Sequence, residues 1–193
     1  DDAIRLNPKD PQYHFERGNA LKEMQRLDEA LASFAAAIHL FPGYAEAHNN
    51  TGIALKEAER FEEALRSYDQ AIRLRPSYAE AHGNRGNVLK ELGRLSEAMA
   101  SYDQAIRLKP DYAEAHYNCG NALLAMNLYD EAVVSYDKAL AFKPHYPEAY
   151  NNRGIALVDL LRMDEAVASY DEAIRLQPDY TEAHSNRGIP LVA

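Results

Sequence analysis

One asparagine recurs at regular intervals along the chain, always within the same sequence context. Its side chain offers both a donor and an acceptor, which suits pairing with the backbone amide of an extended peptide. Asparagine has a low helix propensity, so propensity does not account for a row of asparagines in stretches that look helical. The row therefore predicts a peptide-binding wall, and the alternative is that each amide bonds to the neighbouring repeat. Its members are Asn50, Asn84, Asn118, Asn152 and Asn186.

Two further rows lie one and two helical turns beyond these asparagines. The groove they line is expected to be polar and lysine-lined in the first three repeats and to become apolar in the last two, with Tyr117, Leu124 and Val158. Their lysines could bind an acidic or phosphorylated segment. Alternatively, they balance Glu23, Glu57 and Glu91, which each follow a lysine by one residue. The further binding candidates, including one tyrosine beside the asparagine row, are Asn19, Asn87, Asn121, Lys22, Lys56, Lys90, Tyr117, Leu124 and Val158.

Histidines and arginines also recur with the repeat. Zinc ligands must lie ~2 Å from the metal, whereas successive helices stand ~10 Å apart. We therefore expect packed histidines rather than a metal site at His14, His48, His82, His116 and His184. The arginines could reach carboxylates of a facing helix, such as Asp103 or Asp171, or could form a basic row. They are Arg17, Arg85, Arg153 and Arg187, and Cys119 takes their place in the fourth repeat.

Catalytic motifs are not recognisable in the chain. Serine, histidine and aspartate are present, but neither a nucleophile elbow nor a phosphate-binding loop is. The carboxylate pairs read as charges on helix surfaces. The sequence therefore predicts a protein that is not an enzyme and needs no cofactor.

The elements that position these rows are tandem repeats with a period of about 34 residues, which is typical of stacked helix pairs. In the third repeat, 79–112, helix A is expected from about Ala79 to Leu92 and helix B from Ser96 to about Leu108, closed by Pro110. Ser77 is expected to cap helix A together with Glu80. The whole chain is then predicted to be one continuous array. It starts with the end of a truncated repeat (helix B) at 1–10 and finishes with a partial helix A at 181–193. The full repeats between them are 11–44, 45–78, 79–112, 113–146 and 147–180.

The net charge and the cysteine content indicate which binding partners and which cellular compartment to expect. A formal net charge of −9, from 30 acidic and 21 Lys and Arg residues, disfavours nucleic acid and anionic membranes as partners. Cys119 is the only cysteine, so neither an intrachain disulfide nor a thiolate metal site is possible. No apolar run approaches the ~20 residues of a membrane-spanning helix. These features favour a reducing compartment, and we expect the cytoplasm.

Several positions of the repeat match a known pattern, Trp-x2-Leu-Gly-x2-Tyr followed by Ala-x3-Phe, Ala and Pro. The matching residues in the third repeat are His82, Arg85, Gly86, Leu89, Ala98, Tyr102, Ala105 and Pro110. They resemble the tetratricopeptide repeat (TPR) family, with histidine in place of tryptophan and arginine in place of leucine. The resemblance implies an all-α, right-handed superhelical solenoid of antiparallel helix pairs, whose concave groove is lined by helix A. It also places the asparagine row on the wall of that groove.

Three functions follow as hypotheses. The first is a protein–protein interaction scaffold that holds an extended peptide or partner segment in the groove. The second is the substrate-targeting arm of a larger glycosyltransferase, because the repeats are similar to the superhelical arm of O-linked N-acetylglucosamine transferases. The third is self-association end to end through helices that no capping repeat covers.

Overall fold

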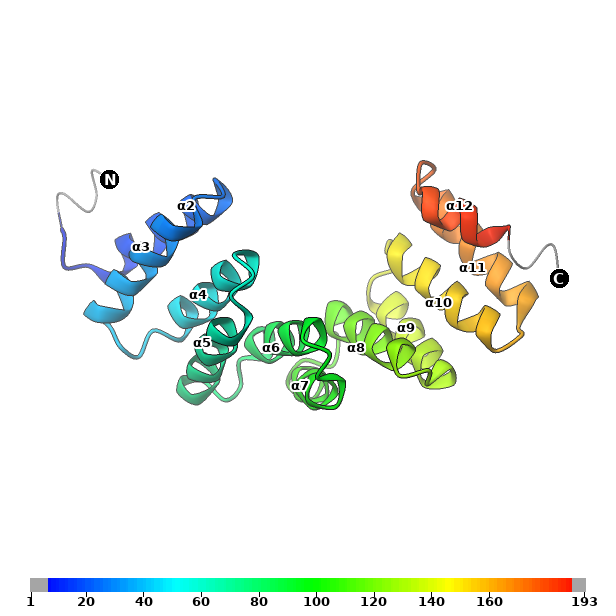
Figure 1. Ribbon diagram of the computed structural model, residues 1–193, viewed down its shortest axis with the longest axis horizontal. Helices are drawn as coiled ribbons and strands as arrows, with labels where there is room; N and C mark the ends of the chain where they lie inside the picture. Colours follow the sequence, from blue (N-terminus) through cyan, green and yellow to red (C-terminus); the bar gives the residue numbers. More distant parts are fainter. Residues whose placement is uncertain (1–6, 189–193) are drawn as a thin grey trace. The chain divides into compact units, whose positions relative to one another are not determined.

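The structure, a computed structural model, describes residues 7–188. Within this range the chain forms eleven α-helices joined by short turns, with no strand (Figure 1), which confirms the predicted all-α class. The chain divides into two compact units, residues 1–97 and 98–193. The predictions for the ends at 1–10 and 181–193 fall partly on residues 1–6 and 189–193, outside the described residues.

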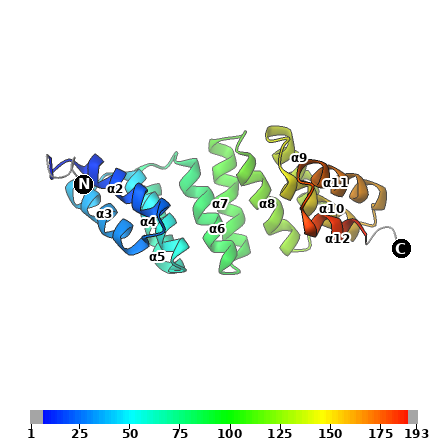
Figure 2. The same cartoon turned by 90° about the horizontal axis from the view of Figure 1, so that it is seen from above.

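The first unit contains two complete helix pairs and the first helix of a third. α2 packs against α3 and α4 against α5, while α3 also packs against α4 and α5 against α6 (Figure 2). The first helix of each repeat is helix A and the second is helix B. The bounds are α2 Pro11–Glu23, α3 Leu27–Leu40, α4 Ala45–Glu57, α5 Phe61–Leu74 and α6 Ala79–Glu91. α7 begins in this unit and continues into the next.

The second unit repeats the arrangement. α8 packs against α9 and α10 against α11, and α9 and α11 pack against the helix A that follows each of them. The shorter α12 corresponds to the partial helix A expected near the end of the chain. The bounds are α7 Leu95–Leu108, α8 Ala113–Ala125, α9 Tyr129–Phe142, α10 Pro147–Asp159, α11 Met163–Leu176 and α12 Thr181–Arg187.

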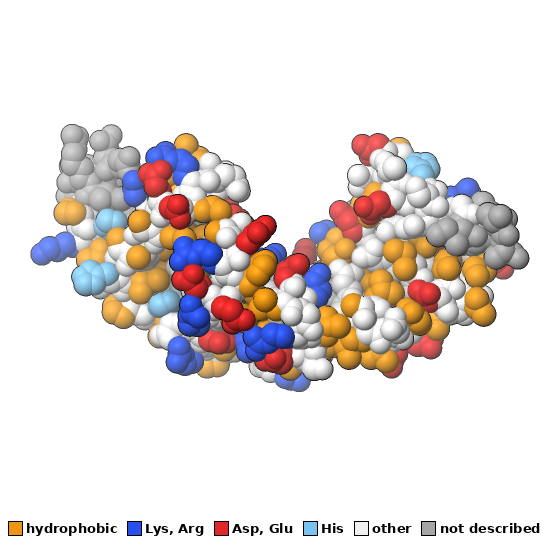
Figure 3. All heavy atoms as spheres, in the orientation of Figure 1, with side chains coloured by type: hydrophobic (Ala, Val, Ile, Leu, Met, Phe, Trp, Pro, Cys, Tyr) orange, Lys and Arg blue, Asp and Glu red, His pale blue; other side chains and the backbone are white. Residues whose placement is uncertain are grey.

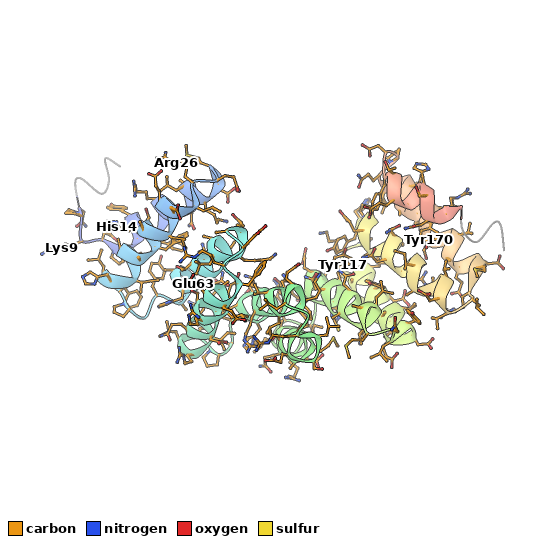
Figure 4. All side chains as sticks on the ribbon, in the orientation of Figure 1. Lys9, His14, Arg26, Glu63, Tyr117 and Tyr170 are labelled. Atoms are coloured by element: carbon orange, nitrogen blue, oxygen red, sulfur yellow. The ribbon has the colours of Figure 1, made fainter. Side chains whose placement is uncertain are left out.

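In four helix pairs, each of which lies within one unit, an aromatic ring of helix B packs onto a glycine of helix A. A Cβ atom placed on Gly52 would lie 2.6 Å from Cε1 of Tyr68, and one on Gly154 would lie 2.5 Å from Cε1 of Tyr170, labelled in Figure 4. Both rings are buried. Any larger residue would overlap the ring, and this close packing explains a glycine that would otherwise weaken the helix.

The ends of helix A differ in part from expectation. Tyr78 rather than Ser77 is the N-cap of α6, and its side chain makes no capping bond. Ser77 lies one residue too early, so the expected capping box is wrong. At the other end, Gly93 has a φ of 70°, and the Arg94 amide donates to the Leu89 carbonyl at 2.8 Å, as in a Schellman motif. Other repeats place non-glycine residues in this left-handed conformation, namely Gln25, Glu59, Asn127 and Leu161.

Candidate functional site on the helix-A face

The asparagine row of the first unit forms hydrogen bonds from repeat to repeat. Nδ2 of Asn50, on α4, donates to Oδ1 of Asn19 on α2 at 2.7 Å. Nδ2 of Asn84, on α6, donates to Oδ1 of Asn49 at 3.1 Å, and Asn49 in turn donates to Oδ1 of Asn50 at 3.2 Å. Asn49 is only 4% exposed, while the other three are half-buried. The amides thus tie successive copies of helix A together.

The second unit contains the same arrangement. Nδ2 of Asn152, on α10, lies 2.9 Å from Oδ1 of Asn121 and 3.2 Å from the hydroxyl of Tyr117, both on α8. Asn186 on α12 donates to Oδ1 of Asn151 at 3.0 Å, and Asn151 donates to Asn152 at 3.1 Å. Asn151 is buried, with an exposed fraction of 2%.

Bonding between repeats is therefore present at Asn50, Asn84, Asn152 and Asn186, as the alternative interpretation of the row expected. Asn118 differs, because its half-buried side chain has no hydrogen-bond partner among residues 7–188. The buried amides of Asn49 and Asn151 also take part in these bonds between repeats, although neither was among the predicted site residues. Their signal was available in the sequence, since each directly precedes a member of the row in an Asn-Asn pair.

The lysine row differs between its members. Nζ of Lys22 lies 3.3 Å from a carboxylate oxygen of Glu23, so the local balance considered for these lysines is present there. Lys56 and Lys90 are half-buried and form no ion pair within the described part of the chain. Asn87, on the same helix as Lys90, is also half-buried and is engaged in an interaction. We call the surface formed by the copies of helix A within one unit the helix-A face. On this face of the first unit, the ammonium groups of Lys56 and Lys90 thus remain available to an anionic group.

The helix-A face of the second unit has an apolar part. The ring of Tyr117, labelled in Figure 4, lies 4.7 Å from the ring of Tyr146 and 6.1 Å from that of Tyr136, measured between centroids. Leu124 and Val158 are half-buried. Burial raises the pKa of Tyr146, so its hydroxyl stays protonated. This face offers contact area to apolar side chains.

The recurring histidines bond to the turns that connect one repeat to the next. In each case Nε2 faces the carbonyl oxygen of the proline six residues earlier, at 2.9 Å for His116 and Pro110 and at 3.0 Å for His82 and Pro76. A carbonyl oxygen can only accept, so Nε2 carries the proton. Residues 7–188 contain no cluster of three or more histidine, cysteine or acidic side chains placed to bind a metal ion.

The arginine row connects neighbouring helices. Arg85 donates to Asp69 at 2.8 Å, and Arg153 donates to Asp137 at 2.6 Å, in each case on the preceding helix B. Arg187 pairs with Asp171 in the same manner. Arg85, Arg153 and Arg187 therefore reach a carboxylate of the facing helix B, which is one of the two alternatives expected from the sequence. Arg17 instead donates to the hydroxyl of Ser33 on α3 at 2.7 Å.

Comparisons with known proteins agree with this architecture. A family model described as TPR repeat matches residues 54–93, 86–127 and 120–160. Models described as tetratricopeptide repeat match residues 147–180 and 11–44. A search of curated proteins gave no match. In the part of the chain that the structure describes, no helix combines the length and the apolar character needed to cross a membrane.

Solved structures resemble the chain over most of its length. YrrB, reported as a TPR protein with an unusual peptide-binding site, is 24% identical, with 97% of this chain and 96% of YrrB covered and a TM-score of 0.75. The MamA protein is 23% identical, with 87% and 92% covered and a TM-score of 0.76. A thermophilic TPR protein of Thermus thermophilus is 22% identical, with 95% and 100% covered and a TM-score of 0.72.

At these identities the structural matches establish the fold, a solenoid of helix pairs. The family-model matches reach from residue 11 to residue 180 with one short gap. They cover well over half of the sequence, and the chain belongs to the tetratricopeptide repeat family.

Proposed function

We propose that the chain is a protein-interaction scaffold whose helix-A faces each bind an extended segment of a partner protein. The TPR repeats and the TPR structural relatives support an interaction scaffold, and one of those relatives has a reported peptide-binding site. The finer assignment, to the helix-A face, depends on the side chains of that face.

Asn118 is the observation that carries this assignment. Its amide is half-buried on α8 and has no partner among the described residues, whereas the equivalent amides of Asn152 and Asn186 are bonded to the preceding repeat. A side-chain amide with both its donor and its acceptor unused can pair with a backbone amide of a guest chain. Tyr117 and Leu124, on the same helix, would contact apolar side chains of that guest.

The first unit supports binding of a different kind. Lys56 and Lys90 are half-buried without an ion pair in the described chain. A partly buried ammonium group is desolvated, so a carboxylate or phosphate of a guest segment would gain a charge-assisted hydrogen bond there. The proposal for this unit is thus an anionic segment, and for the second unit a segment with apolar residues.

The test compares two asparagines that the structure distinguishes. Peptides are selected from a random display library on the whole chain, and the Kd of one selected peptide is measured by fluorescence polarisation. Asn118→Ala should raise Kd about fivefold, the equivalent of one hydrogen bond of ~1 kcal/mol, without changing the free energy of unfolding. Asn152→Ala, the matched control, should lower the free energy of unfolding by ~1–2 kcal/mol because it breaks bonds between repeats.

If Asn118→Ala, Lys56→Ala and Lys90→Ala each leave Kd unchanged in a folded protein, the helix-A face is not the binding site. The two other hypotheses, a glycosyltransferase arm and self-association through the ends, stay predictions. No contact within residues 7–188 bears on either of them.

A further inference from the structure

The space between successive copies of helix B differs in size with the residue at the arginine position of helix A. Arg153 on α10 donates to Asp137 on α9 and to Ser169 on α11, both at 2.6 Å. Its guanidinium group therefore spans the gap between these two helices. The cavity that remains beside it measures about 320 Å³.

Thr51 replaces the arginine in the second repeat, and a groove of about 650 Å³ lies there. Its hydroxyl turns back to donate to the Ala47 carbonyl at 2.8 Å, so it does not reach across. The position equivalent to Asp137 is Ala35, which has no carboxylate. We call this space, between α3 and α5 with α4 as its floor, the Thr51 groove. Its volume lies within the ~300–1,000 Å³ of ordinary ligand sites.

The Thr51 groove combines an apolar floor with a cationic rim. Leu55 of α4, on the floor, is 5% exposed, and Leu31 and Ile38 of α3 continue the apolar surface up one side. Arg66 and Arg73, on the rim, are exposed and form no ion pair within residues 7–188. Figure 3 shows histidine and Lys or Arg side chains beside hydrophobic ones over α3 to α5, with acidic side chains between them, around the place where Figure 4 labels Glu63.

Charge distinguishes this groove from the rest of the molecule. Three arginines and one glutamate line it, and the glutamate, Glu63, is already held by Arg60 through two bonds of 2.8 Å. Arg66 and Arg73 therefore leave the lining of this groove with a net positive charge, on a chain whose net charge is −9. Such a local field attracts and orients an anionic partner.

The Cys119 groove, two repeats later, provides an internal comparison. Cys119 also replaces the arginine, and a groove of about 470 Å³ lies at the equivalent positions of α7, α8 and α9. Its lining carries the carboxylates of Asp103, Asp130 and Glu131 and a single lysine, Lys138. The two grooves thus lie at equivalent positions of the repeat but have opposite charge.

We propose that the Thr51 groove is a second binding surface, which takes a short acidic segment of a partner protein. An apolar side chain of that segment would lie over Leu31, Ile38 and Leu55, and carboxylates on either side would pair with Arg66 and Arg73. Arginine binds carboxylates through two parallel N–H bonds, which fixes orientation as well as charge. The surface lies on the helix-B side of α3 and α5, and it is independent of the helix-A face proposed above.

The first test uses charge reversal with a matched control. The probe is a fluorescein-labelled octapeptide in which two leucines are flanked by glutamates, and binding to the whole chain is followed by fluorescence polarisation. Arg66→Glu with Arg73→Glu should raise Kd at least tenfold. Arg107→Glu with Arg175→Glu makes the same change in net charge at the Arg73 position of other repeats, outside the Thr51 groove, and should change Kd less than twofold. An equal loss in both double variants would show general electrostatic attraction and overturn the proposal.

The second test closes the groove without changing net charge. Thr51→Arg with Ala35→Asp recreates the Arg153 and Asp137 pair, so the groove should fill with a guanidinium group. We expect at least a tenfold loss of probe binding, with the helical circular dichroism and thermal unfolding retained. Full binding by this folded variant would exclude the groove as the site. Asn118→Ala should leave probe binding unchanged, which separates this surface from the helix-A face.

Discussion

The hydroxyl group of Tyr136 donates a hydrogen bond of 2.8 Å to the side-chain oxygen of Asn121. Two repeats earlier, Ile53 takes the place of the asparagine, and the buried hydroxyl of Tyr68 has no partner among the described residues. Burial raises the pKa of both tyrosines, so both hydroxyls stay protonated over the accessible pH range. Whether the buried tyrosine hydroxyl has a hydrogen-bond partner thus depends on one position of helix A, which is asparagine in one repeat and isoleucine in the other.

This difference predicts opposite effects for the same substitution. Tyr136→Phe should lower the free energy of unfolding by ~1 kcal/mol because it removes a hydrogen bond. Tyr68→Phe removes a buried hydroxyl that has no bond, so it should be neutral or stabilising by up to ~1 kcal/mol. Urea unfolding followed by circular dichroism measures both. Equal destabilisation by the two variants would contradict the difference seen here.

The packing of aromatic rings on glycine predicts the sign of a helix substitution. Alanine in place of Gly52 would improve helix propensity by ~1 kcal/mol. However, its Cβ would lie 2.6 Å from the ring of Tyr68, and overpacking of this kind costs ~1–3 kcal/mol. We expect net destabilisation in chemical unfolding. Gly43→Ala is the control, because its Cβ would lie 3.3 Å from Phe41, whose side chain is exposed, and the loss should be small.

A left-handed residue after α10 predicts a stabilising change. Leu161 has a φ of 58° and is 78% exposed, so its side chain gains little from packing. Leu161→Gly should raise the free energy of unfolding by ~0.5–1 kcal/mol, because the strain exceeds the entropy that glycine adds to the unfolded chain. The reverse change, Gly93→Leu, should destabilise by a similar amount. A lower melting temperature for Leu161→Gly would refute the assignment of strain.

His48, in the Thr51 groove, predicts a dependence on pH. Burial lowers the pKa of His48 below its usual 6.5, and this effect exceeds the opposing one of its bond to the Pro42 carbonyl. Since the folded pKa is below the unfolded one, the associated stability is present above pH 6.5 and is lost as pH falls through the folded pKa.

An NMR titration of the His48 ring should therefore give a pKa below 6.5. The free energy of unfolding should fall less steeply with acid in His48→Gln than in the native chain. A ring that titrates at or above 6.5 would show that burial does not control its protonation.

The fold could be predicted from the regular period of the sequence, because each core position occurs five times in equivalent surroundings. The arginine pairs could also have been found, since Arg85, Arg153 and Arg187 each follow an aspartate of the preceding helix B at the same separation in the chain.

The direction of the amides could not be predicted in this way. Whether Asn84 points to a guest or to Asn49 depends on the distance between two packed helices, and the period does not encode it. The cap at Tyr78 was missed because Ser77 offers a better capping side chain one residue too early, and tertiary packing rather than capping chemistry sets the start of α6.

Each aromatic ring and the glycine beneath it belong to the same repeat. An in-frame duplication or deletion of one such stretch carries both partners with it and breaks no ring-to-glycine contact. New members of the array can therefore enter the genome with their interiors already matched, and mutation is left to vary the surfaces that meet other molecules.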